Sequence, residues 1–73
     1  MRELRSEVVG ERRVRLLADS DGRYSVTIEV WTGAWEDISL RSDQGLALHT
    51  ASLYYRLRLT EQEMRAVEWE REA

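Results

Sequence analysis

The sequence predicts a small α+β domain: a three-stranded antiparallel β-meander followed by one long and one short α-helix that pack on one face of the sheet. In the first half of the chain, apolar and polar residues alternate, which is the spacing of β-strands. The second half changes to helical spacing and places Ser42 and Thr60 where helix N-caps are expected. With 73 residues, the chain is predicted to be a single domain over 1–73.

The first predicted strand covers residues 13–18. Val14 and Leu16 fall on one face of this strand because side chains alternate along it. The opposite face then carries Arg13, Arg15 and Leu17. The next four residues are rich in aspartate and end in Gly22, which predicts a tight turn into a hairpin.

The second predicted strand, residues 24–31, has the clearest alternation in the chain. Its apolar face consists of Tyr24, Val26, Ile28 and Val30. These residue types favour strands, and a short loop at 32–34 then leads into a third strand over residues 35–40. Two successive short hairpins predict an antiparallel meander.

The long helix is predicted to begin at Ser42, with Asp43 in its first turn, and to end near residue 58. It has two apolar faces, which are Leu46, Thr50, Leu53, Tyr54 and Leu57 on one side and Leu48, Ala51, Tyr55 and Leu59 on the other. One face would cover the sheet, and the other would need the next helix or a second copy of the chain. Residues 53–59 also alternate, so a strand is the competing interpretation.

The short helix follows Thr60, which forms a capping box with Glu63. The segment 60–73 carries five acids against two arginines and accounts for the net charge of -3, so an acidic C-terminal helix is predicted. Residues 1–11 show no firm pattern. They are predicted to form either a flexible arm or an extra edge strand through Val8 and Val9.

Trp31 and Trp35 are predicted to lie on the sheet face opposite the helices. Alternation places Trp31 away from the apolar side of its strand, and an ordinary hairpin gives Trp35 the same orientation. The same alternation puts Arg13, Arg15 and Arg41 around them. The two rings could form a cross-strand pair that stiffens the hairpin, or a contact surface, because tryptophan and arginine dominate interface hot spots.

A chain of this size has a small hydrophobic core and usually needs a disulfide, a metal site or a partner subunit for stability. It has no cysteine and one histidine, which leaves oligomerisation in place of disulfides or a metal site. No apolar run approaches the length of about 18 residues needed to span a membrane, and residues 1–7 do not resemble a signal peptide. A soluble, cytoplasmic protein is therefore predicted.

No catalytic pattern is found in the sequence. His49 stands alone, the serines have no signature of an activated nucleophile, and the adjacent Glu36 and Asp37 would point to opposite faces of a strand. Asp19 and Asp21 lack the later ligands of a calcium loop. We therefore expect no enzymatic activity, no cofactor and no metal.

These features predict a non-catalytic protein–protein interaction module that forms a homodimer or binds a larger protein. A small regulator or inhibitor, such as a phage or plasmid accessory protein, would have this size. The predicted contact residues are Trp31, Trp35, Arg13, Arg15, Arg41, Leu48 and Tyr55. The alternative is a nucleic-acid-binding module in which Arg12, Arg13, Arg15 and Arg41 contact phosphates while Trp31 and Trp35 stack on bases.

Overall fold

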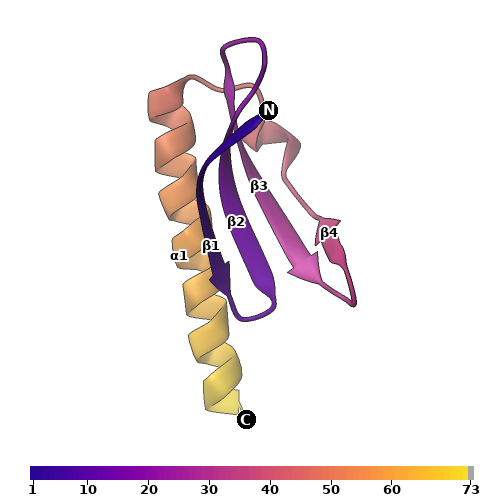
Figure 1. Cartoon of the computed structure of the whole chain (residues 1–73). Helices are drawn as coiled ribbons and strands as arrows, with labels where there is room; N and C mark the ends of the chain where they lie inside the picture. Colours follow the sequence, from indigo (N-terminus) through magenta and orange to yellow (C-terminus); the bar gives the residue numbers. More distant parts are fainter. Residues whose placement is uncertain (73) are drawn as a thin grey trace.

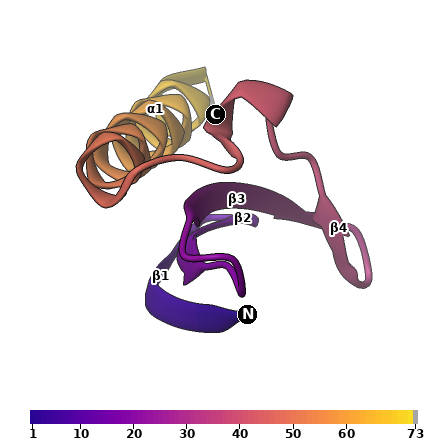
Figure 2. The same cartoon turned by 90° about the horizontal axis from the view of Figure 1, so that it is seen from above.

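The computed structural model describes the backbone of residues 1–72 and the side chains of residues 1–68. A four-stranded antiparallel sheet in the order β1-β2-β3-β4 lies against one long helix, which confirms the predicted α+β class (Figure 1). The elements are β1 (Arg2–Val9), β2 (Arg12–Ala18), β3 (Tyr24–Trp31), β4 (Trp35–Asp37), the 3-10 helix η1 (Arg41–Asp43) and α1 (Leu48–Glu72). Both helices lie on the same side of the sheet (Figure 2).

The first eleven residues hold the edge strand β1 and not a loose arm. β1 pairs antiparallel with β2 along its whole length, for example Val8 with Arg13 and Ser6 with Arg15, with a bulge between Glu3 and Arg5. Nearly every residue of β1 is exposed. An edge strand with polar residues on both faces lacks hydrophobic alternation, which is why its length could not be recognised from the sequence.

The central pair β2 and β3 follows the predicted alternation. Val14 lies opposite Ile28, and Leu16 lies opposite Val26. The third predicted strand, 35–40, was too long, because β4 ends at Asp37. The Asp37 carboxylate accepts a hydrogen bond from the Ser39 backbone N–H at 2.8 Å where the chain turns out of the sheet. Hydrogen bonding by the Ser39 side chain, and then by this backbone N–H, lowers the pKa of the carboxyl group.

The predicted start of the long helix at Ser42 was wrong. Residues Arg41–Asp43 form η1, and Gly45 follows with φ of +65°, a left-handed conformation that interrupts helical backbone. Leu46 then pairs with Tyr24 of β3 through two backbone hydrogen bonds of 2.7 and 2.8 Å. Glycine at position 45 was the sequence signal for this interruption.

Helix α1 is continuous over its 25 residues, so the predicted break at Thr60 and the competing strand over 53–59 were both wrong. Neither proline nor glycine occurs between Leu48 and Glu72, and a capping box alone does not end a helix that side-chain packing continues to hold. The acidic C-terminal segment is thus the end of the same helix. Residue 73 and the side chains of residues 69–72 lie outside the described part of the chain.

The core lies between α1 and the middle of the sheet. Its buried side chains are Val14, Leu16, Val26, Ala51 and Tyr55. Tyr24, Leu46, Tyr54 and Leu59 pack around this cluster and are partly buried. The sheet therefore presents one face to α1, and its other face is not covered by any helix within the described residues (Figure 2). No helix in that part of the chain is both long and apolar enough to cross a membrane.

Candidate protein interface

The two tryptophans form a cross-strand pair at the tip of the β3–β4 hairpin. Trp31 lies directly opposite Trp35, with ring centroids 5.3 Å apart and an interplanar angle of 64°. The loop between them is closed by a hydrogen bond of 3.0 Å from the Thr32 N–H to the Ala34 carbonyl, with Gly33 at φ of +100°. The prediction that both rings share the face opposite the helix is confirmed, and Trp31 is 47% exposed.

Arg13 of β2 completes the aromatic cluster. Its guanidinium carbon lies 4.5 Å from the centre of the Trp35 ring, which is cation–π geometry. Its Nε donates to the Glu29 carboxylate at 2.7 Å, and this bond raises the pKa of Arg13. Arg13 is therefore held from two sides, by an aromatic ring and by a carboxylate.

Arg15 lies on the same face and is also paired. Its Nε is 2.8 Å from a Glu3 carboxylate oxygen, and its Nη1 is 3.7 Å from Glu29. We call this surface the Trp/Arg patch and define it by Trp31, Trp35, Arg13, Arg15 and Glu29. The positive charges of Arg13 and Arg15 are balanced by the negative charges of Glu29 and the neighbouring Glu3. The surface around the tryptophans therefore carries no excess of positive charge.

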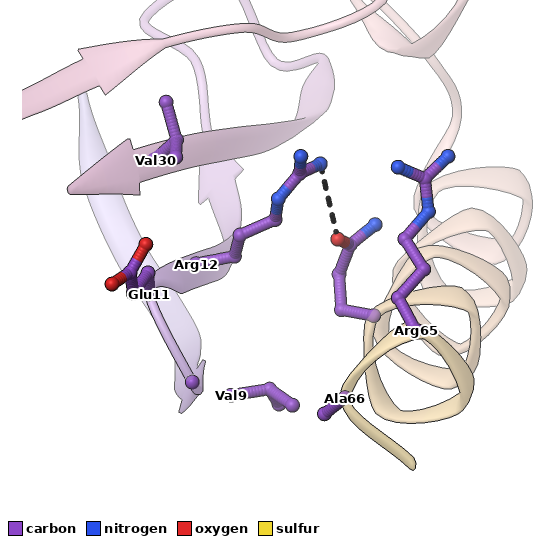
Figure 3. A pocket seen from close by; sticks show the side chains of 8 residues that line it. Val9, Glu11, Arg12, Val30, Arg65 and Ala66 are labelled. Atoms are coloured by element: carbon purple, nitrogen blue, oxygen red, sulfur yellow. Dashed lines mark hydrogen bonds between the residues drawn. The ribbon is translucent and has the colours of Figure 1, made fainter. Parts of the chain in front are cut away.

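Arg41 and Arg12 do not belong to the Trp/Arg patch, contrary to prediction. Arg41 lies in η1, on the helix side of the sheet, because β4 ends before the strand alternation can reach position 41 (Figure 2). Arg12 alternates with Arg13 and also points to the helix side. There its Nη1 donates to the Oε1 of Gln62 at 3.3 Å, and Gln62 is buried (Figure 3).

Arg12 lines a cleft of about 400 Å³ between the β1–β2 hairpin and the later turns of α1. The cleft residues are Val9, Gly10, Glu11, Arg12, Val30, Gln62, Arg65 and Ala66. Arg65 stands on the helix wall beside Gln62 (Figure 3). Sequence reasoning missed this cleft because it arises only where a hairpin and a helix some fifty positions apart meet, as in the Arg12–Gln62 bond.

Tyr55 was predicted to contact a partner, but it is only 2% exposed and forms part of the core. Its ring lies under β1, with the Arg5 guanidinium 5.6 Å from its centre. Leu48 does remain accessible, at 48% exposure, in the first turn of α1. The structure thus turns the face that contains Ala51 and Tyr55 toward the sheet, and the opposite face of α1 toward solvent.

The solvent-facing side of α1 exposes a set of large apolar side chains that the predicted contact residues did not include. They are Leu53, Leu57, Met64 and Val67, each about half exposed or more. We call this set the outer stripe. The signal was present in the sequence as apolar residues at helical spacing, but the break assumed at Thr60 divided it between two helices.

His49 is exposed on α1. Among the described residues, no group of three or more histidine, aspartate or glutamate side chains could hold a metal ion. Comparison with known proteins gives no match to a family model, a curated protein or a solved structure.

Proposed function

We propose that this protein is a non-catalytic protein-interaction module, a small regulator or inhibitor whose Trp/Arg patch contacts a larger partner protein. The observation that carries the proposal is the half-exposed Trp31 in an ordered cluster of aromatic and charged side chains. Tryptophan and arginine are the residues that contribute most to binding hot spots. An exposed indole at a hairpin tip is a surface that a partner can bury.

The side chains of the Trp/Arg patch are held in fixed conformations, and this favours binding. Trp31 packs edge-on against Trp35, and Arg13 is fixed between the Trp35 ring and Glu29. Immobilising a free side chain at an interface costs about 0.5–1.5 kcal/mol, and much of that cost is already met in the unbound protein when neighbours restrict the rotamer. The patch is therefore preorganised for binding in the unbound protein.

The ion pairs of the patch favour a protein partner over nucleic acid. Binding to a phosphate backbone depends on arginines that are available to neutralise phosphates. Arg13 and Arg15 each contact a carboxylate, and Arg12 and Arg41 lie on the other side of the sheet. A nucleic acid would have to displace Glu29 and Glu3, whereas a protein surface can add hydrogen bonds to these pairs.

The test is affinity capture from the source cell with the wild-type protein, Trp31→Ala and Leu40→Ala. Leu40 is the matched control because it is an exposed apolar residue outside the patch, with 44% exposure against 47% for Trp31. We expect one protein to be captured by wild type and Leu40→Ala and lost with Trp31→Ala. The affinity loss should be about 30-fold, typical of a hot-spot tryptophan.

Identical capture by all three proteins would contradict the proposal. A mobility-shift assay tests the alternative function, which is nucleic-acid binding. If the protein binds nucleic acid, and if that binding weakens steeply with salt and on changing Arg13 and Arg15, the patch is a nucleic-acid surface instead.

A further inference from the structure

The outer stripe has the spacing of a coiled-coil seam. The outer stripe, together with Thr50 and Thr60, forms a seam from Thr50 to Val67 whose residues repeat at alternating intervals of three and four. Leu53 and Leu57 each follow a buried residue by two positions, namely Ala51 and Tyr55, and Met64 follows the buried Gln62 in the same way. Two positions correspond to about 200° around a helix, so the stripe points directly away from the sheet.

We propose that a second copy of this chain covers the outer stripe, with the two α1 helices packed antiparallel. The inference rests on the proposed role as an interaction module and names one of its partners. The seam from Thr50 to Val67 is about 26 Å long, which is enough for several layers of side chains. No described part of the chain lies over it, because the sheet and η1 are on the other side of α1 (Figure 2).

The charged residues beside the stripe are complementary to those of a second copy of the chain when the two helices are antiparallel. One flank of the stripe carries the exposed Arg56 and Glu63, and the other carries Glu61 and Glu68. In an antiparallel pair, each flank meets the same flank of the other helix. When the two seams overlap from Thr50 to Val67, Arg56 lies opposite Glu63 of the partner subunit, and the two-fold axis repeats this contact.

A parallel pair would be less favourable. It would place the Arg56 and Glu63 flank of one helix against the Glu61 and Glu68 flank of the other. Arg56 would then approach Glu61 of the partner subunit, but Glu63 would approach Glu68 of the partner subunit and be repelled. The antiparallel arrangement gives two attractive contacts and places no acid opposite another acid, so the charge pattern favours it.

The side chains of the seam fit the same antiparallel register. Leu53 packs against Met64 of the partner subunit, Leu57 packs against Thr60 of the partner subunit, and Thr50 packs against Val67 of the partner subunit. The dimer would then consist of sheet, helix, helix and sheet, with the two Trp/Arg patches on its outermost faces. Such a dimer holds two partner molecules at once. This raises the effective affinity for an oligomeric partner that presents two binding sites.

The experiment is sedimentation equilibrium of the full chain, with circular dichroism to confirm that each variant folds. We expect a wild-type dimer and a dissociation constant at least about 100-fold higher for Leu57→Glu, because two buried leucines are lost per dimer. Leu40→Glu is the matched control. It makes the same change at 44% exposure against 47% for Leu57, outside the stripe, and should remain a dimer.

Charge variants test the orientation without removing apolar contacts. Glu63→Arg should weaken an antiparallel dimer about tenfold, and adding Arg56→Glu should restore it. In a parallel dimer Glu63→Arg would instead strengthen association. The chain has no natural cysteine, so a mixture of Leu53→Cys and Met64→Cys proteins should cross-link under oxidation, whereas Leu53→Cys alone should not.

A wild-type protein that stays monomeric, or a Leu57→Glu variant that folds and stays dimeric, would overturn the inference. Self-cross-linking of Leu53→Cys would overturn the antiparallel orientation. These results are separate from those for the Trp/Arg patch, because Trp31→Ala should leave the dimer intact. A monomer that still captures its partner through Trp31 would retain the proposed function and remove only this inference.

Discussion

Asp43 and Arg58 form a two-pronged ion pair that joins η1 to the middle of α1. Asp43 is fully buried, and its two carboxylate oxygens accept hydrogen bonds from Nε and Nη2 of Arg58 at 2.7 and 3.0 Å. The Asp43 carboxylate raises the pKa of Arg58. Arg58 also lies 3.2 Å from Glu61. The pair joins η1 to the side of α1 that carries Arg58, and the burial of Ala51 and Tyr55 turns the same helix toward the sheet.

Removing Arg58 should strongly destabilise the fold, because a buried carboxylate would lose its partner. We expect Arg58→Ala to lower the free energy of unfolding by about 3–5 kcal/mol, measured by urea denaturation at fixed protein concentration. Arg41→Ala is the control, since Arg41 is exposed in the same 3-10 helix as Asp43 and should change stability by less than about 0.5 kcal/mol. Equal small effects would show that the pair does not hold η1 in place.

The hydroxyl of Tyr55 is buried and has no hydrogen-bond partner among the described residues. Tyr55→Phe should therefore leave stability unchanged or raise it by up to about 1 kcal/mol at neutral pH, because an unsatisfied polar group is removed from the core. The denaturation midpoint measures this change. A loss of more than about 1 kcal/mol would mean that the hydroxyl is hydrogen-bonded in solution.

The same residue predicts an alkaline limit to stability. Burial, with a contribution from the charge of Glu7, raises the pKa of Tyr55 above its usual value of 10.0. The unfolded chain then ionises before the folded one, so the stability linked to this group is complete below about pH 10 and is lost as the pH rises through the folded pKa. Denaturation from pH 8 to 12 should show a shallower alkaline decline for Tyr55→Phe than for wild type.

Gly45 should tolerate asparagine better than alanine. Its φ of +65° is left-handed, so Gly45→Ala should cost about 1–2 kcal/mol through the backbone alone. Space is not limiting, because an added Cβ would meet only the Arg23 side chain at 3.9 Å. Asparagine accepts this conformation more readily, and Gly45→Asn should cost less. Equal losses for both variants in thermal denaturation would point to a steric cause instead.

The Trp31–Trp35 contact should contribute measurably to hairpin stability. A double-mutant cycle with Trp31→Ala and Trp35→Ala should give a coupling energy of about 0.5–1.5 kcal/mol, as expected for an edge-to-face aromatic pair. A coupling energy near zero would mean that the rings do not pack in solution. The stiffening role and the binding role of this pair are compatible, because Trp31 remains half exposed while it contacts Trp35.

The location of the Trp/Arg patch was largely predictable from the sequence, whereas the outer stripe was not. Trp31, Trp35, Arg13 and Arg15 lie on one sheet face because strand alternation determines their direction locally. The outer stripe depends on α1 being continuous through Thr60 and on Ala51 and Tyr55 facing the sheet. The second condition could not be derived locally, because both sides of this helix are apolar and either could have covered the sheet.

The sequence by itself determined the two central strands and the turns at Gly22 and Gly33, since alternation and glycine act between residues that are neighbours in the chain. Tertiary structure alone decided the pairing of the polar strand β1, the start of α1 at Leu48 and the rotation of that helix. These features depend on contacts between distant positions, such as Leu46 with Tyr24 and Asp43 with Arg58. Local propensity does not encode such contacts, because the stabilisation appears only when the two segments pack together.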